Sequence, residues 1–133
     1  MNKIAIDTNI LVYLFDEYFV DKREMAGNLV DANPIISSQV VSEFLNVSKR
    51  LLKISKLDIL KKCNESIRKC NIIPTNQIVL NHAEAIIVRY DLQLFDAIIV
   101  ASALEAGCTI LYTEDMHHGL IIEDTLSIIN PFV

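Results

Sequence analysis

The sequence predicts a helix-rich α/β fold built on a parallel sheet of about five short strands. Short β-rich apolar runs alternate with longer stretches of helical periodicity along the chain. These runs lack the in/out alternation of a sheet with one solvated face, which is typical of strands buried on both faces. The 133 residues are 52% apolar and 22% charged, a length and composition that suit one domain with its own core. We therefore expect a single domain over residues 1–133.

The elements are assigned from periodicity and from cap residues. Strands are expected at 3–6, 34–36, 71–73, 109–112 and 126–129. Helices are expected at 9–19, 22–32, 39–53, 56–70, 76–90 and 95–106. Gly107 is expected to end the last helix, because glycine adopts the left-handed conformation of a helix C-cap without strain.

Composition also indicates the compartment. Cys63, Cys70 and Cys108 form no CxxC pair, and an odd number of cysteines cannot all pair with each other, which favours free thiols in a reducing environment. The first residues offer no signal-peptide pattern, and no apolar run approaches the roughly 18 residues of a membrane span. We therefore expect a cytoplasmic protein with no membrane association.

Positive charge is concentrated in one segment although the net charge is −5. Residues 49–69 contain eight Lys and Arg against two acids, whereas the rest of the chain has four basic residues against fifteen acids. Such a segment can bind a phosphate backbone, or it can be the solvated face of amphipathic helices. Both interpretations stay open at this point.

Two acids follow predicted strands directly. Asp7 comes after the strand at 3–6, and Asp115 comes just after the strand at 109–112. In parallel sheets ligands bind outside the carboxyl ends of the strands, so both side chains are candidates for chemistry. Alone, either one is as well explained by a structural role.

Two further acids lie on predicted helices. Asp96 opens an apolar run that continues to Leu104, where it either caps the helix or faces the sheet edge. Glu43 borders the apolar arc of the helix at 39–53, so it is either an exposed surface residue or part of a crevice. If all four acids meet, their mutual repulsion requires a cation, and Mg²⁺ or Mn²⁺ suits carboxylate oxygens. Spacing alone supports an acidic metal site and does not identify a reaction.

Four elements taken in order resemble the PIN-domain ribonucleases, and most closely the toxins of VapBC-type toxin–antitoxin pairs. They are Asp7-Thr-Asn-Ile-Leu11, Glu43, the run from Leu94 to Ala103, and Thr113-Glu-Asp115. The resemblance implies a three-layer α/β/α sandwich with a central parallel sheet. It also implies a metal-dependent endoribonuclease that cleaves RNA phosphodiester bonds with water activated by Mg²⁺ or Mn²⁺.

The resemblance assigns roles to individual residues. It implies that Asp7, Glu43, Asp96 and Asp115 are the catalytic metal ligands, and that Asn9 and Thr113 hydrogen-bond to these acids or to the metal's waters. It further implies a small antitoxin partner and a homodimer. The basic segment would hold the RNA backbone, with Lys49, Arg50 and Lys53 as the candidate contacts.

Alternative functions remain. The chain could be a PIN nuclease of RNA processing that has no antitoxin, or a catalytically weak PIN-fold module that binds RNA or protein. A receiver-like phosphoacceptor domain is disfavoured, because residues 71–74 contain no acid and no lysine follows Lys69. His82, His117 and His118 lack the spacing of zinc ligands and are interpreted as ordinary surface or loop residues.

Overall fold

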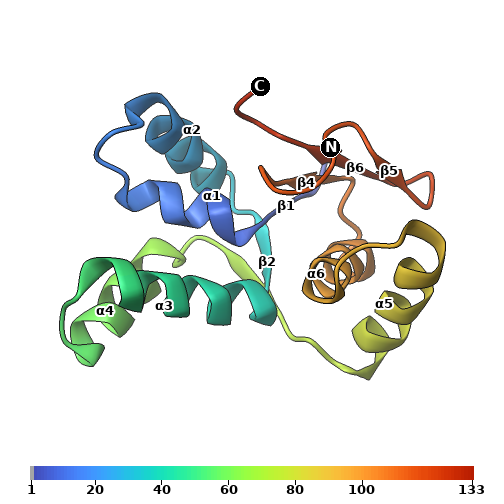
Figure 1. Ribbon diagram of the computed structural model, residues 1–133, viewed down its shortest axis with the longest axis horizontal. Helices are drawn as coiled ribbons and strands as arrows, with labels where there is room; N and C mark the ends of the chain where they lie inside the picture. Colours follow the sequence, from blue (N-terminus) through green and yellow to red (C-terminus); the bar gives the residue numbers. More distant parts are fainter. Residues whose placement is uncertain (1) are drawn as a thin grey trace.

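The computed structural model describes residues 2–133, which form one six-stranded sheet with helices on both sides (Figure 1). The strands in chain order are β1 (Ile4–Ile6), β2 (Ile35–Ser37), β3 (Asn71–Ile73), β4 (Ile110–Tyr112), β5 (Ile121–Ile122) and β6 (Leu126–Ile129). The helices are α1 (Thr8–Val12), a single 3₁₀ turn η1 (Tyr13–Phe15), α2 (Val20–Asp31), α3 (Ser38–Leu52), α4 (Lys56–Ser66), α5 (Gln77–Tyr90) and α6 (Leu94–Glu105). The fold is therefore α/β, as the alternation of strand and helix patterns predicted.

The strand order in the sheet is β3-β2-β1-β4-β6-β5. The five predicted strands are present, and all their pairings are parallel. A sixth strand that was not predicted, β5, lies at one edge and pairs antiparallel with β6. Glu123 and Asp124, with left-handed φ values of +52° and +55°, begin the three-residue connection between them, in which the N–H of Thr125 donates to the carbonyl of Ile122 at 3.0 Å. The sheet is thus mixed and mostly parallel.

Two predicted helices are shorter than expected. The helix at 9–19 ends as η1, because Asp16 leaves the helical conformation and its Oδ1 accepts hydrogen bonds from the backbone N–H groups of Tyr18 and Phe19, both at 2.8 Å. The helix at 56–70 ends at Ser66, and Ile67 begins a turn toward β3. At the first helix end the side chain of Asp16 takes up the next backbone N–H groups, and at the second the N–H of Arg68 bonds to the carbonyl of Glu65 at 3.3 Å instead of continuing the helix.

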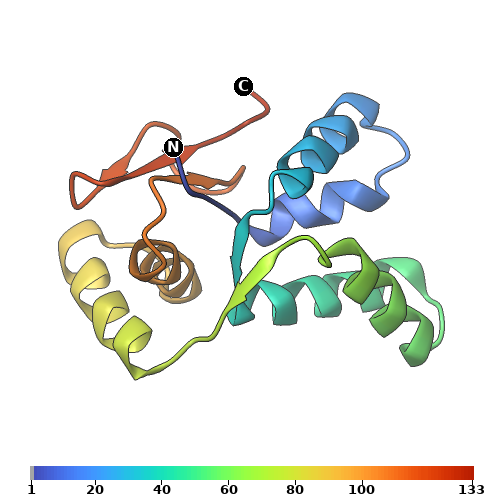
Figure 2. The same cartoon turned by 180° about the vertical axis from the view of Figure 1, so that it is seen from behind.

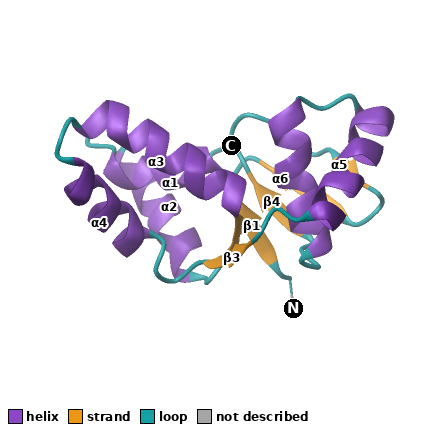
Figure 3. Ribbon diagram, turned by 90° about the horizontal axis from the view of Figure 1, so that it is seen from below, coloured by secondary structure: helices purple, strands orange, loops and turns teal. Residues whose placement is uncertain are grey.

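The helices cover the sheet from both sides, which confirms the α/β/α sandwich. In Figure 1 and in the reverse view of Figure 2, α1 to α4 gather on one side of β1 and β2, while α5 and α6 lie on the other side beside β4 and β6. Figure 3 shows the strands running between the two groups of helices. One continuous apolar cluster joins the layers, with Ile6, Phe44, Val100 and Leu111 fully buried in it. No helix of residues 2–133 combines the length and hydrophobicity needed to cross a bilayer.

Helix ends near the sheet edge are fixed by local signals. Ser37, the last residue of β2, caps α3 by accepting from the N–H of Val40 at 3.1 Å. Gly107 has φ +80° and follows α6 as predicted, and the N–H of Cys108 reaches back to the carbonyl of Ala103 at 2.9 Å. These caps set where α3 and α6 begin and end relative to the strands.

Candidate active site

Two neighbouring strands end at the candidate site. β1 pairs in parallel with β4, and Ile6 lies opposite Tyr112, so the residues that follow them are side by side. The backbone N–H of Asp7 donates to the carbonyl of Tyr112 at 3.0 Å, and the hydroxyl of Thr113 donates to Oδ2 of Asp7 at 2.8 Å. Asp7 is only 4% exposed. The sheet therefore carries a buried carboxylate at its carboxyl edge, at the predicted position.

Asn9 links Asp7 to the end of the β4 strand. Its side-chain NH₂ lies 3.4 Å from Oδ2 of Asp7, 3.2 Å from the hydroxyl of Thr113 and 3.1 Å from Oδ2 of Asp115. Its side-chain carbonyl accepts from the backbone N–H of Glu114 at 3.1 Å. Because one amide bridges both strand ends, Asp7 and Asp115 cannot move independently. Asn9 and Thr113 thus hydrogen-bond to the acids, which is the arrangement that the resemblance implied.

Glu43 and Asp96 approach from two helices that pack against each other, α3 and α6. Both side chains are partly buried. Oε2 of Glu43 accepts from the side chain of Gln39, one turn earlier on α3, at 3.2 Å. Asp96 lies in the first turn of α6, where the N-cap is Gln93 and no side chain caps the helix. The alternative of Asp96 as a helix cap is therefore wrong.

The four acids influence one another's ionisation. Burial raises the pKa of Asp96 to about 6, and the charges of Asp7, Glu43 and Asp115 add to the rise. Burial also raises the pKa of Asp7, against the hydrogen bonds from Thr113 and Thr8, and the charge of Asp115 raises it further. Burial raises the pKa of Glu43 in the same way, together with the charges of Asp7 and Asp115. Within residues 2–133, no Lys or Arg contributes to these three shifts. The structure thus brings all four predicted acids within electrostatic reach without a compensating base.

A pocket of about 480 Å³ opens beside these carboxylates. Glu43 on one wall faces it together with Asn9, Glu114 and Asp115 on the other. Asp7 and Asp96 are not on its lining. Two of the four acids, Glu43 and Asp115, therefore line the pocket.

The donor set fits a hard divalent cation. Carboxylate oxygens are the ligands that Mg²⁺ and Mn²⁺ prefer, and Mg²⁺ commonly uses one or two carboxylates and keeps several waters. The hydroxyl of Thr8, a residue 8% exposed, lies close enough to Asp7 and Glu43 to lower the pKa of each, yet it has no hydrogen-bond partner. In residues 2–133 no three Asp, Glu, His or Cys side chains are gathered closely enough to enclose an ion. These acids therefore do not form the closed cage of a structural metal site.

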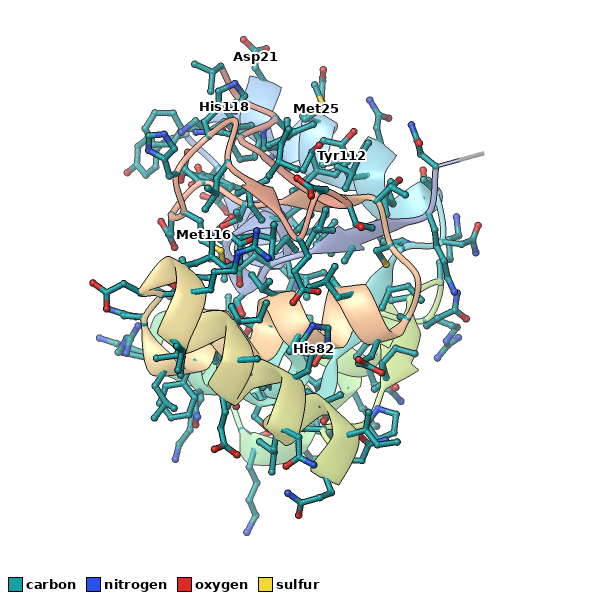
Figure 4. The ribbon with its side chains drawn as sticks, turned by 90° about the vertical axis from the view of Figure 1, so that its right-hand side faces the viewer. Asp21, Met25, His82, Tyr112, Met116 and His118 are labelled. Atoms are coloured by element: carbon teal, nitrogen blue, oxygen red, sulfur yellow. The ribbon has the colours of Figure 1, made fainter. Side chains whose placement is uncertain are left out.

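The basic residues, His82 and the cysteines singled out in the sequence lie outside the group of four acids. Lys49, Arg50 and Lys53 are all exposed, at the C-terminal end of α3 and just beyond it. His82, which was interpreted as an ordinary surface or loop residue, lies on α5 (Figure 4). Its Nδ1 lies 2.6 Å from Glu105 on α6, and its Nε2 lies 2.9 Å from Glu123. The three cysteines, Cys63, Cys70 and Cys108, are free as expected.

Sequence reasoning missed one polar cluster beside the pocket. Glu114 accepts from the hydroxyl of Tyr13 at 2.6 Å and from the ammonium of Lys22 at 2.7 Å. The position of Glu114 between Thr113 and Asp115 is a signal that could have pointed to it. No spacing rule connects Lys22, 92 positions earlier in the chain, with that loop.

A mostly parallel sandwich with converging carboxylates at the carboxyl edge of its sheet defines an α/β protein with an acidic site of enzymatic type. The PIN domain family profile matches residues 4–119, which is most of the sequence. The chain belongs to the PIN domain family, as the motif resemblance implied.

Solved structures of other proteins share this fold. A toxin–antitoxin complex from Klebsiella pneumoniae aligns with a TM-score of 0.72 and 25% identity, over 97% of each chain. FitAcB from Neisseria gonorrhoeae aligns with a TM-score of 0.72 and 19% identity, over 97% of this chain and 98% of its own. The sarcin–ricin loop cleaving toxin VapC20 from Mycobacterium tuberculosis aligns with a TM-score of 0.66 and 17% identity, over 85% and 90%. No curated protein sequence matches the chain significantly. The fold is therefore that of PIN-domain toxins of toxin–antitoxin systems.

Proposed function

We propose that the protein is a Mg²⁺- or Mn²⁺-dependent endoribonuclease. The observation that carries the proposal is the convergence of Asp7, Glu43, Asp96 and Asp115 at one sheet edge with no basic residue to neutralise them. Such a charge cluster is stable at neutral pH when a cation binds to it. Membership of the PIN domain family supports a nuclease.

In this proposal each residue has a defined task. Glu43 and Asp115 line the pocket and offer carboxylate oxygens to a cation. Asp7 and Asp96 do not line the pocket, and they add negative charge that attracts the cation. When bound, the ion would activate water and stabilise charge on the phosphodiester. Asn9 and Thr113 hold Asp7 and Asp115 in fixed positions, since outer hydrogen bonds of this kind set ligand orientation.

The RNA substrate would lie along the exposed basic side chains that continue from the pocket wall. Asn46 and Val47 of α3 line the pocket, and Lys49, Arg50 and Lys53 follow them toward the end of the same helix. Lys and Arg contact phosphates without reading sequence, so this surface would position RNA and not select it. The proposal places the protein in the cytoplasm with its substrate, and its free thiols agree with a reducing compartment.

We further propose that the protein is the toxin of a toxin–antitoxin pair and that it forms a homodimer. The similarity to the Klebsiella pneumoniae toxin–antitoxin complex supports the antitoxin partner. Tyr18 is 92% exposed and Phe19 57% exposed at the start of α2, so an apolar surface is available for a small protein. Sedimentation of the isolated chain, and of the chain co-expressed with the product of the adjacent reading frame, tests both partners.

One observation favours the alternative of a catalytically weak binding module. No three carboxylates in residues 2–133 are already drawn together around a common point. A protein that only binds RNA or a partner would tolerate this arrangement. A measurement of metal binding and RNA cleavage distinguishes the two functions.

The experiment compares wild type, Asp7→Asn and the matched control Asp91→Asn. Asp91 is an exposed residue in the left-handed conformation after α5, which asparagine also adopts. Mn²⁺ should raise the melting temperature of wild type and of the control, and raise that of Asp7→Asn less. Cleavage of structured RNA should require the metal. Equal thermal shifts in all three proteins, or cleavage undiminished in excess EDTA, would refute the proposal.

A further inference from the structure

Lys22 on α2 neutralises an acid at the mouth of the pocket. Its ammonium donates to Oε2 of Glu114 at 2.7 Å and to the hydroxyl of Tyr13 at 3.1 Å. The same hydroxyl donates to Oε1 of Glu114 at 2.6 Å, so both oxygens of this carboxylate are bound. We name Tyr13, Lys22 and Glu114 the clamp. It joins η1 and α2 to the loop that follows β4.

Aromatic rings surround the ammonium of the clamp. Lys22 lies 4.9 Å from the ring centroid of Tyr13 and 5.2 Å from those of Phe19 and Phe132. The rings of Tyr13 and Phe132 meet edge to face with centroids 5.0 Å apart. Three rings around one cation restrict where the ammonium can lie, while the Lys22 side chain stays 30% exposed. The clamp is therefore better ordered than an isolated surface ion pair, whose contribution is small.

The clamp acts on the segment that carries two of the site residues. Glu114 separates Thr113 from Asp115, and its backbone N–H is held by the side chain of Asn9 at 3.1 Å. Asn9 also donates to Asp115 at 3.1 Å. The loop is thus attached twice, through its backbone to Asn9 and through its side chain to Lys22. Loss of the side-chain attachment leaves Asp115 held by Asn9 and by the bond from its own backbone N–H to the hydroxyl of Thr113 at 3.2 Å.

The clamp also compensates the negative charge of Glu114. Both oxygens of the Glu114 carboxylate are occupied, one by the hydroxyl of Tyr13 and the other by the ammonium of Lys22, so the positive charge of Lys22 compensates that of Glu114. Glu114 lines the same pocket as Glu43 and Asp115. Without Lys22 it would add a fifth uncompensated carboxylate to the site, and a phosphate backbone would meet greater repulsion.

We infer that Lys22 is a positioning residue: through Glu114 it fixes the loop that carries Asp115 and withholds the Glu114 charge from the RNA. The inference rests on the proposed nuclease function for its effect on RNA and not for its effect on the loop. Lys22 touches no substrate in this role. Its two effects are separable by experiment.

Four variants test separately how the ion pair affects the loop and how it affects the charge in the pocket. Lys22→Met removes the charge and keeps an apolar stem among the rings, Glu114→Gln removes the partner's charge, and the double variant removes both. Arg89→Met is the matched control, because Arg89 also lies over an aromatic ring, 5.1 Å from that of Tyr90, and does not line the pocket. Amide hydrogen exchange at Glu114 and Asp115 reports the loop. KM and kcat for a short RNA with Mn²⁺ report the charge.

Lys22→Met should speed exchange at both amides about tenfold and raise KM about tenfold, since hydrogen bonds to charged groups have effects of that size. The double variant should return KM to within about twofold of wild type, because the exposed charge is gone. Arg89→Met should match wild type in both measurements. A purely structural ion pair predicts a KM defect that Glu114→Gln does not rescue.

Two results would overturn the inference: unchanged amide exchange in Lys22→Met, or a double variant with a KM as high as that of Lys22→Met. A wild-type protein that cleaves no RNA would refute the nuclease proposal instead. In that case amide exchange alone decides, with faster exchange supporting the loop positioning by Lys22 and unchanged exchange overturning it.

Discussion

The hydroxyl of Thr113 donates to Oδ2 of Asp7 at 2.8 Å, which joins two residues 106 positions apart in the chain. Both side chains are buried, with Thr113 fully covered and Asp7 4% exposed. Hydrogen bonds to a buried carboxylate favour its ionised form, and this one opposes the rise in the pKa of Asp7 that burial causes. Thr113 therefore keeps Asp7 charged down to a lower pH than burial alone would allow.

Thr113→Val should raise the pKa of Asp7 and move the acidic limb of the cleavage–pH profile to higher pH. Thr113→Ser retains the hydroxyl and should keep the wild-type profile, which makes it the matched control. The valine variant should also lose about 1–2 kcal/mol of unfolding free energy, since a hydrogen bond to a charged group is lost in the core. The pH dependence of kcat/KM in the three proteins measures the effect. An acidic limb that does not move in Thr113→Val would contradict it.

Asp96 should make the metal-free protein less stable as pH rises. Its pKa is raised from 3.8 to about 6, so between these values the folded state binds more protons than the unfolded state, and stability falls through this window. Asp96→Asn removes the dependence and should stabilise the metal-free protein at pH 7. After a discount for partial exposure we expect a gain of about 1–2 kcal/mol.

Urea denaturation of wild type and Asp96→Asn at pH 4 and pH 7 checks this prediction. The two proteins should differ little at pH 4 and diverge at pH 7. The same variant should lose cleavage activity. A variant less stable than wild type at pH 7 would show that Asp96 has a structural role instead.

His82 should give a pH dependence of the same sign in a higher pH window. Both ring nitrogens face carboxylates, Glu105 at 2.6 Å and Glu123 at 2.9 Å, and only the imidazolium has an N–H for each. Burial lowers the pKa of His82, but the bonds to Glu123 and Glu105 outweigh it and raise the pKa above 6.5. The stabilisation is complete below pH 6.5 and is lost as pH rises through the raised value.

His82→Gln should therefore cost about 1 kcal/mol at pH 6 and much less at pH 9, as judged by chemical denaturation. His117→Gln is the control, because His117 is exposed. A cost for His82→Gln that is the same at both pH values would mean that the ring matters only for packing.

Reversal of Lys49, Arg50 and Lys53 to Glu should weaken RNA binding and flatten its dependence on salt. Each lost phosphate contact on a single strand reduces the slope of log K against log salt by about 0.7. Three contacts would reduce it by about 2 in total. Arg89→Glu, at an exposed position on α5, is the control for a change in net charge. Filter binding across a salt series gives the slopes, and an unchanged slope would make the basic segment an ordinary solvated surface.

The extent to which sequence predicted the fold differed from element to element. The strands that flank the site were predictable because each is a short apolar run followed by an acid or a helix cap. β5 was missed because it has two residues and its turn begins with Glu123-Asp124, which lacks the glycine or asparagine that normally marks such a hairpin. The early end of the first helix was missed because Asp16 acts through its side chain on two backbone groups that follow it. Hydrophobic periodicity detects neither a two-residue strand nor a bond from a side chain to the backbone.

The residues of the candidate site also differed in how far the sequence predicted them. Asp7 and Asp115 were predictable from their strands, since the carboxyl ends of parallel strands meet at one edge. Glu43 and Asp96 needed a family resemblance, because helical periodicity places a side chain on a face and not next to a residue of another helix. The pairs of Lys22 with Glu114 and of His82 with Glu105 and Glu123 depend on packing between distant segments. No spacing in one sequence reveals such pairs.

The central place of β1 in the sheet has a consequence for synthesis. A chain emerging from the ribosome presents Asp7 almost at once, but β4 and the residues that hold Asp7 come more than a hundred residues later. A nascent chain or a prematurely terminated product that stops before position 113 thus has Asp7 but not the strand end that holds it. The acidic cluster can therefore be completed only after most of the chain has been synthesised.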